Sequence, residues 1–153
     1  MKLCFVRHAE ADYELEKESG EFPGVPLTSK GFSQAEDLAN RLKNESFDGI
    51  YCSDMLRTMQ TLSPSLRHLP TQPVYDSRLR EISDAAVGGH NDNWYREPLK
   101  DQIERMESFL KHIKTLKGSI LIVCHYGVIR YLTEKLGKLA DSPEYVKPYI
   151  LSL

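Results

Sequence analysis

The sequence predicts an α/β fold, namely a three-layer α/β/α sandwich around a mostly parallel sheet, formed by a single domain over residues 1–153. Short apolar runs recur along the chain and are typical of strands buried on both faces. They alternate with stretches whose apolar residues recur at helical spacing. This alternation favours parallel strands covered by helices on both faces. The 153 residues suffice for one domain with its own core.

The first half of the chain predicts two strands and two helices in alternation. Residues 3–6 form an apolar run, and the polar residues 11–26 predict a long loop. Thr28 stands at the N-cap of a helix that reaches about Asn44. Residues 50–52 predict a second strand, after which Ser53 or Asp54 can cap a second helix. The expected apolar residues are Phe32, Ala35, Leu38, Ala39 and Leu42 in the first helix and Leu56, Met59, Leu62 and Leu66 in the second.

The second half repeats the pattern. Val74-Tyr75 predicts a third, weaker strand, and residues 83–98 predict a loop that holds the only tryptophan, Trp94. A helical stripe over 103–116 precedes residues 120–124, the strongest strand pattern of the chain. A last helix follows, with Ile129, Leu132, Leu136 and Leu139 expected to face inward, and the segment from Asp141 has no assignment.

Composition excludes several classes of protein. The chain has 20 Lys+Arg against 22 Asp+Glu, which gives no electrostatic footprint for nucleic acid. No apolar run approaches the ~20 residues of a membrane span, and the apolar stretch at the start is too short for a secretory signal. We therefore expect a cytoplasmic protein without nucleic-acid or membrane partners; its oligomeric state is left open.

The three cysteines, Cys4, Cys52 and Cys124, lie far apart and form no CxxC pair. Neither a zinc ribbon nor a redox motif is supported. The expected state is three reduced thiols that act as small hydrophobic residues.

Polar clusters directly follow three predicted strands. They are Arg7-His8, Ser53 with Arg57, and His125-Tyr126. Ligands of parallel α/β sheets bind outside the carboxyl ends of the strands. We therefore expect folding to gather these clusters at one edge of the sheet.

Two histidines, two arginines and a carboxylate suit phosphoryl chemistry. Guanidinium groups match phosphate oxygens bidentately and stay charged at all relevant pH values. Neighbouring cations disfavour protonation of a histidine, so a neutral His8 could attack phosphorus. His125, if protonated, would stabilise charge on the equatorial oxygens, and a carboxylic acid would protonate the leaving alkoxide.

Five ordered segments resemble the histidine phosphatase superfamily, also called the phosphoglycerate mutase-like family. Arg7-His8-Ala9-Glu10 resembles its RHG motif, and Val123 to Ile129 resembles its VSHGGVI segment. The other three are similar to its LTxxG..QA, SxxxRxxQT and L.E segments: Leu27 to Gly31 with Gln34-Ala35, Ser53 to Thr61, and Leu79 to Ile82. Together they span residues 3–136.

The resemblance implies a phosphoglycerate mutase-like fold and a role for each matching residue. His8 would be the nucleophile that becomes phosphohistidine. Arg7 and Arg57 would clamp the phosphate, and His125 would complete the pocket. Glu81 would act first as general acid and then as the base that activates water. No metal or other cofactor is implied, because the arginines supply the positive charge.

The chain departs from the family pattern at three positions. Ala9 replaces a glycine, and Glu14 stands where many members carry a phosphate-contacting asparagine. Tyr126 replaces a glycine beside the pocket; it could contact the substrate or serve only in packing. The short interval between Glu81 and His125 leaves little room for the insertions that shield the intermediate in mutases, which favours hydrolysis over mutase activity.

The leading hypothesis is a metal-independent phosphatase for phosphorylated small metabolites. A protein phosphohistidine phosphatase acting on phosphotransfer proteins is the second hypothesis, since the short chain and the RHAEA start resemble that branch. A catalytically silent module that binds a phosphorylated partner is the third. At the level of single residues, Arg57 could be a solvated helix residue and Glu81 part of a surface salt-bridge patch. His125, His8 and two cysteines could also form a metal site, although their spacing is not that of local zinc ligands.

Overall fold

The computed structural model describes residues 1–15, 22–83, 86 and 97–153. Its centre is a five-stranded sheet in the order β3-β2-β4-β1-β5. The strands are β1 (Lys2–Arg7), β2 (Gly49–Cys52), β3 (Pro73–Tyr75), β4 (Ser119–Cys124) and β5 (Tyr149–Ser152). All neighbouring pairs are parallel except β1 with β5. The predicted mostly parallel sheet is therefore confirmed.

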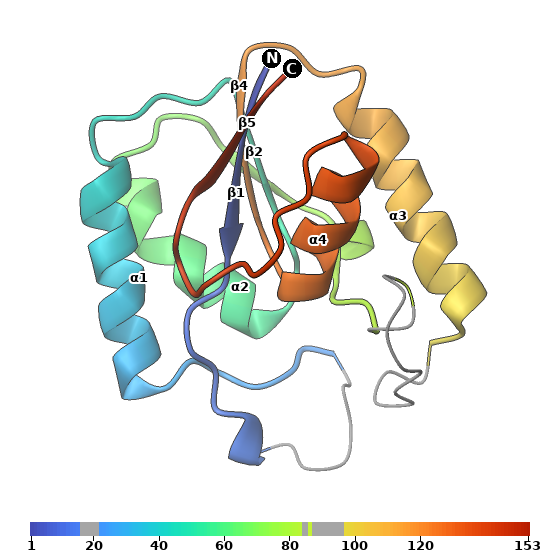
Figure 1. The fold of residues 1–153 in the computed structure, drawn as a ribbon. Coiled ribbons are helices and arrows are strands. Elements are labelled where there is room, and N and C mark those ends of the chain that lie inside the picture. The colour runs from blue at the N-terminus through green and yellow to red at the C-terminus, as the bar shows by residue number, and fades with distance from the viewer. Residues whose placement is uncertain (16–21, 84–85, 87–96) are drawn as a thin grey trace.

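Four α-helices cover the sheet: α1 (Ser29–Leu42), α2 (Leu56–Leu62), α3 (Leu99–Ile113) and α4 (Tyr126–Lys135). The helices α1 and α2 lie on one face, and α3 and α4 lie on the other (Figure 1). Three short 3₁₀ helices complete the described elements: Tyr13–Leu15, Ser63–Arg67 and Ser77–Leu79. The predicted three-layer α/β/α sandwich is confirmed.

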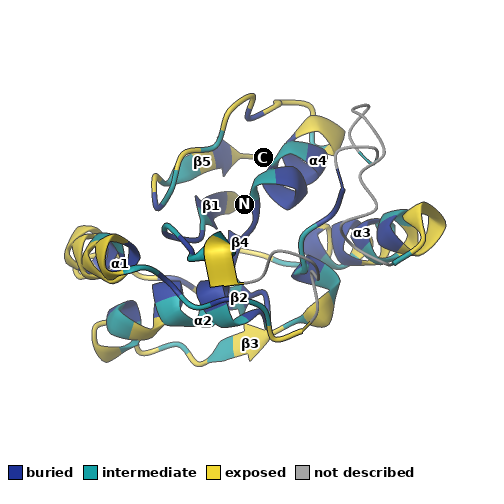
Figure 2. Cartoon of the chain, turned by 90° about the horizontal axis from the view of Figure 1, so that it is seen from below, coloured by how far each residue is buried: buried dark blue, intermediate teal, exposed yellow. Residues whose placement is uncertain are grey.

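Two apolar cores, one on each face of the sheet, follow from the alternation of side chains along the strands. Leu3 and Phe5 of β1 join the core under α3 and α4, whereas Cys4 and Val6 join the core under α1 and α2. Figure 2 shows the buried sides of the helices turned toward the sheet and their exposed sides turned outward. No helix among the described residues is long and apolar enough to cross a membrane.

The three cysteines occupy the three central strands, one each on β1, β2 and β4, and all are free and buried. Burial raises the pKa of the Cys4 thiol to about 11 and raises those of Cys52 and Cys124 as well. The prediction that the three cysteines are free thiols packed as small hydrophobic residues is confirmed.

Helix α1 begins as predicted, because the Thr28 hydroxyl accepts a hydrogen bond from the Gly31 N–H at 3.0 Å. One of its predicted core residues, Phe32, is 46% exposed instead, since the buried face comprises Gly31, Ala35, Leu38, Ala39 and Leu42.

The prediction that Ser53 or Asp54 caps α2 is wrong. The N-cap is Met55, which makes no side-chain cap, because both polar side chains have other partners. Ser53 contacts His125, and the Asp54 carboxylate pairs with Arg80 at 2.7 Å. The α-helix ends at Leu62, where the 3₁₀ segment begins, and its buried face holds Arg57, Thr58, Thr61 and Leu62 rather than Leu56 and Met59.

Two differences occur near the C-terminus. Leu139 is 43% exposed, because α4 ends at Lys135 before this residue could face the core. The unassigned segment contains β5, which pairs antiparallel with β1. The predicted loop over 83–98, including Trp94, lies for the most part outside the described residues.

Candidate active site

The three predicted polar clusters meet at the carboxyl ends of β1, β2 and β4, which are neighbours in the sheet. The strand hydrogen bonding continues one residue beyond each end: the His8 N–H donates to the Cys124 carbonyl and the Ser53 N–H to the Val123 carbonyl, both at 3.0 Å. The sheet therefore fixes the backbone of His8, Ser53 and His125 at one edge. The predicted juxtaposition of these clusters is found.

The rings of His8 and His125 face one another at a centroid separation of 5.3 Å, and both residues are almost fully buried. Nδ1 of His8 lies 2.6 Å from the Ala9 carbonyl oxygen, which can only accept, so this nitrogen carries the ring proton. Nε2 then holds the lone pair, to which the Tyr13 hydroxyl donates at 3.2 Å. The tautomer of His8 is thus set by its own backbone.

Burial and the positive charge of Arg57 lower the pKa of His8 to about 3, and Arg7 acts in the same direction. The neutral, nucleophilic form of the ring is therefore the stable one at physiological pH. The same causes, burial first and Arg57 second, lower the pKa of His125 well below its usual value. These effects favour the neutral ring of His125, with one N–H donor and one acceptor nitrogen, over the protonated ring of the conditional expectation.

His125 takes its orientation from Ser53, whose hydroxyl lies 2.8 Å from Nε2. The Ser53 oxygen accepts from the Met55 N–H at 3.3 Å, and its own proton has no acceptor other than His125 among the described residues, so the hydroxyl donates to Nε2. The ring proton of His125 then sits on Nδ1, an atom buried without a hydrogen-bond partner among the described residues. This N–H therefore has no acceptor among the described residues.

The arginines add two further buried donors. Arg57, the second residue of α2, is only 2% exposed, and Arg7 ends β1. The Nε atoms of both are buried without a hydrogen-bond partner within the described ranges. Buried charges are costly unless paired, so this part of the molecule is built to receive an anion.

Glu81 lies beside the N-terminus of α4. Its Oε1 accepts from the Ile82 N–H at 2.9 Å and from the Gly127 N–H at 3.0 Å, and Arg105 donates to its carbonyl oxygen at 2.7 Å. Burial raises the pKa of the Glu81 carboxyl, and this effect exceeds the lowering by the two backbone hydrogen bonds. The balance therefore shifts toward the protonated acid relative to a free carboxyl. The bonds of Oε1 to two backbone N–H groups do not fit a surface salt-bridge patch.

Tyr126 is the first residue of α4, and its ring centroid lies 5.2 Å from the guanidinium carbon of Arg7. Glu14, at the position of the family's asparagine, is exposed, while its neighbour Tyr13 contacts His8. No group of three or more His, Cys, Asp or Glu residues that could hold a metal ion occurs in the described part of the chain.

Sequence reasoning missed two residues that contact the cluster, Tyr13 and Tyr145. It placed Ser53 in the cluster but missed its role as a partner of His125. Other motif residues support the backbone rather than the chemistry. Thr61 accepts from the Ala9 N–H at 2.9 Å, Gln34 accepts from the Glu10 N–H at 2.8 Å, and Gln60 accepts from the Leu27 N–H at 2.8 Å. The positions of these side chains in the motifs could have predicted that they hold the backbone by hydrogen bonds.

The edge of the sheet presents two arginines, two buried histidines and a partly buried acid, which is the equipment of a protein that handles phosphate groups through histidine. The chain belongs to the histidine phosphatase superfamily (branch 1), whose family model matches residues 3–93. That range contains Arg7, His8, Arg57 and Glu81, whereas His125 lies beyond it.

Relatives and solved structures agree with this assignment. The chain is 34% identical to "Putative phosphoserine phosphatase 2" of Hydrogenobacter thermophilus, over 84% of this chain and 74% of that protein. It is 28% identical to the adenosylcobalamin/alpha-ribazole phosphatase of Escherichia coli, over 89% and 79%. The fold matches the protein histidine phosphatase SixA complexed with tungstate at a TM-score of 0.69 and 19% identity, over 100% of this chain and 88% of that one. The family and these names support a phosphatase, which is a hydrolase.

Proposed function

We propose that this protein hydrolyses phosphomonoesters of small metabolites without a metal ion, through a phosphohistidine on His8. The observation that carries the proposal is the Nδ1–H of His8 on the Ala9 carbonyl. It leaves the Nε2 lone pair as the only nucleophile of the ring, in a surrounding whose positive charge comes from Arg7 and Arg57.

Binding of the phosphate would satisfy three buried donors. The Nε groups of Arg7 and Arg57 and Nδ1 of His125 have no partner among the described residues, and phosphate oxygens are strong acceptors for such groups. The same donors stabilise charge on the equatorial oxygens as the phosphoryl group transfers.

In the first step, the Tyr13 hydroxyl releases Nε2 of His8, and this lone pair forms a bond to phosphorus. The bond between phosphorus and the ester oxygen breaks, and its electrons stay on the leaving oxygen. Glu81, whose protonated form burial favours relative to a free carboxyl, gives its proton to that oxygen.

In the second step, the Glu81 carboxylate accepts a proton from water while the water oxygen attacks phosphorus. The bond from phosphorus to Nε2 breaks and its electrons return to the ring. Inorganic phosphate leaves, and His8 and the protonated Glu81 are both restored.

Glu81 distinguishes this proposal from a protein phosphohistidine phosphatase. An imidazole leaves phosphorus without the help of an acid, whereas an alkoxide needs one. An acid with a raised pKa beside the histidines supports an ester substrate. The similarity to SixA extends to the fold and does not favour its substrate.

The test is a phosphatase screen over phosphorylated metabolites and one phosphohistidine protein, with wild type, His8→Ala and Glu81→Gln. We expect hydrolysis of at least one metabolite ester, loss of turnover in His8→Ala, and a decrease in kcat of about 10²- to 10⁴-fold in Glu81→Gln. Glu104→Gln, on the exposed side of α3, is the matched control. Full ester activity in Glu81→Gln contradicts the proposal. Wild-type turnover of the phosphohistidine protein alone supports a protein phosphohistidine phosphatase instead. A wild-type protein that turns over none of the substrates supports the catalytically silent module.

A further inference from the structure

The segment between α4 and β5 holds Arg7 at both its backbone and its side chain. Arg7 and Tyr145 form an isolated parallel bridge, in which the Val146 N–H donates to the Arg7 carbonyl at 3.0 Å. The guanidinium of Arg7 donates through Nη1 to the Pro143 carbonyl at 3.2 Å. One stretch of four residues, Pro143–Val146, therefore determines where this arginine lies.

Tyr145 adds a side-chain contact to these backbone contacts. Its ring centroid lies 4.1 Å from the guanidinium carbon of Arg7, closer than the ring of Tyr126 at 5.2 Å. The same ring lies 5.8 Å from the ring of His8, centroid to centroid. Tyr145 is thus in contact with both the phosphate-binding cation and the nucleophile of the proposed reaction.

The backbone that presents Tyr145 is strained. Val146 has a φ of 51°, in the left-handed region that β-branched residues rarely adopt, and it is buried. Conformations of this kind persist only where the surrounding contacts impose them, and they cluster at functional sites. The strain here lies one residue after Tyr145, where the chain bonds to Arg7.

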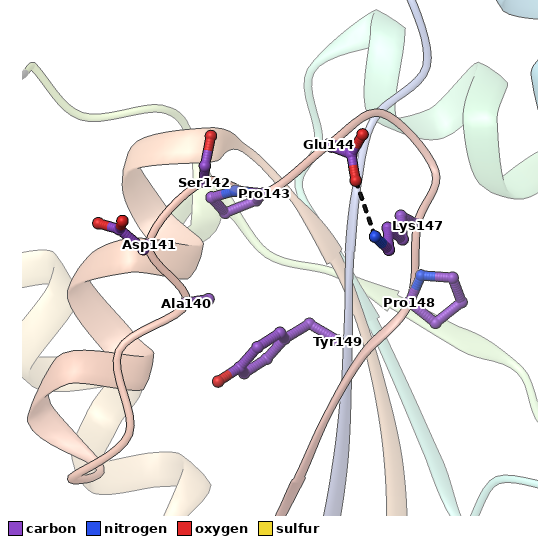
Figure 3. Close-up of a pocket in the computed structure, with 8 residues that line it drawn as sticks. All are labelled: Ala140, Asp141, Ser142, Pro143, Glu144, Lys147, Pro148 and Tyr149. Atoms are coloured by element: carbon purple, nitrogen blue, oxygen red, sulfur yellow. Dashed lines mark hydrogen bonds and ion pairs between the residues drawn. The ribbon is translucent and has the colours of Figure 1, made fainter.

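Packing on the turn itself is incomplete. The turn borders a pocket of about 130 Å³ whose lining includes Pro143, Pro148 and Tyr149. Glu144 and Lys147, two exposed residues of the same loop that also line it, pair at 2.8 Å (Figure 3). Because the turn is only partly packed, its contacts with Arg7 help to hold it in place, and the turn also helps to position Arg7.

We propose that Tyr145 is a positioning residue of the phosphate site, which acts through Arg7; this inference rests on the proposed function. An arginine with freely rotating bonds loses conformational entropy when it binds an oxyanion. The Tyr145 ring restricts the guanidinium before the phosphate arrives and interacts favourably with its charge. Tyr145 lies outside residues 3–93, which the family model matches.

The test measures the binding of inorganic phosphate by calorimetry, and kcat and KM with an alkyl phosphate that the enzyme hydrolyses. Tyr145→Leu is expected to weaken phosphate binding and raise KM about 3- to 30-fold, which corresponds to the loss of one cation–π contact. Tyr145→Phe, which keeps the ring, stays within about threefold of wild type. Tyr149→Leu is the matched control and remains unchanged; Tyr149 is the first residue of β5, and its hydroxyl donates to the Lys138 carbonyl.

Coupling to Arg7 separates positioning from general stability. In an Arg7→Gln background, which lacks the cation, Tyr145→Leu is expected to change phosphate binding less than about twofold. An equal loss of phosphate affinity in both backgrounds overturns the inference. So does wild-type phosphate affinity in Tyr145→Leu, and so do equal losses of affinity in Tyr145→Phe and Tyr145→Leu. If Tyr145→Leu does not fold, Tyr145→Met removes the ring with less change in volume.

The two proposals fail in different ways. A wild-type protein that binds inorganic phosphate but hydrolyses no ester overturns the proposed function, and the binding arm then decides the role of Tyr145 alone. A wild-type protein that binds no phosphate overturns both. Normal turnover with no effect of Tyr145→Leu overturns only the inference on Tyr145.

Discussion

Gly127 allows α4 to approach Glu81 because it has no side chain. A Cβ at position 127 would stand 2.7 Å from Oε1 of Glu81 and 3.0 Å from Cγ1 of Ile82, whereas the Gly127 N–H donates to that same carboxylate oxygen at 3.0 Å. The position of the acid therefore depends on the absence of a methyl group in the first turn of α4.

Gly127→Ala should move the Glu81 carboxyl away from the leaving group. We expect kcat for an alkyl phosphate to decrease about 10- to 100-fold, because small displacements of a catalytic group are costly. Binding of inorganic phosphate should change far less, since the arginines are untouched. Steady-state kinetics and calorimetry measure the two effects, with Lys135→Ala at the far end of α4 as control. An alanine variant with wild-type kcat would contradict the assigned role of Glu81.

The pH profile of kcat should have an alkaline limb set by Glu81 and displaced upward from the range of a free carboxyl. Glu81 is active as an acid only while protonated, and its raised pKa extends that form upward from the usual value of 4.5. Activity should therefore decrease as the pH rises through this raised pKa. On the acid side, His8 loses its lone pair only near its pKa of about 3. Rates with an alkyl phosphate between pH 3 and pH 9 measure the profile.

Glu81→Gln provides the control for this profile. Its residual activity should lack the alkaline decrease, because the amide does not titrate. A profile in which the variant keeps the wild-type decrease would assign that limb to another group.

The stability of the fold should decrease in mild acid because of His8. Its native pKa of about 3 lies below the ordinary 6.5, so between these values the unfolded chain binds a proton that the native chain does not. This contribution is complete above pH 6.5 and is lost as the pH falls toward 3, by about 2 kcal/mol between pH 6.5 and pH 5. Urea unfolding at these two pH values measures it.

His8→Asn removes the titrating ring and should reduce the loss of unfolding free energy between pH 6.5 and pH 5 by about 2 kcal/mol. The lowered pKa of His125 leaves a residual effect of the same sign. His68→Asn, at an exposed position, should keep the wild-type pH dependence. Equal acid sensitivity in the His8 variant and wild type would mean that His8 is not buried as a neutral ring.

Gly31→Ala should destabilise the chain near His8. A Cβ at this position would stand 2.1 Å from the Glu10 carbonyl oxygen, a backbone atom that cannot move without displacing the loop after β1. We expect a loss of about 1–3 kcal/mol in the free energy of unfolding, together with reduced activity. Urea unfolding measures the loss, and the exposed neighbour Lys30→Ala serves as control. Wild-type stability would show that the loop can yield.

The residues that directly follow parallel strands could be predicted from the sequence. Arg7, His8 and His125 stand next to apolar runs, and the carboxyl ends of parallel strands meet at one edge. Tyr13 and Tyr145 could not be predicted, because they reach His8 from segments without a periodic pattern. The edge strand β5 was missed for a similar reason: it is short, partly exposed and preceded by prolines.

Helix ends were less predictable than helix interiors. Thr28 caps α1 as expected, since its hydroxyl has a free amide within reach. The Ser53 hydroxyl accepts from the Met55 N–H, before the first residue of α2, and also contacts His125, a partner more than seventy residues away. A local pattern cannot show such a long-range partner.

The cysteines on the three central strands give the protein a built-in reporter of sheet opening. Each thiol is buried and protonated, so an alkylating reagent can reach it only after its strand has separated from the helices that cover it. Mass spectrometry after a pulse of such a reagent would show which strand is released first, and no foreign label would be needed.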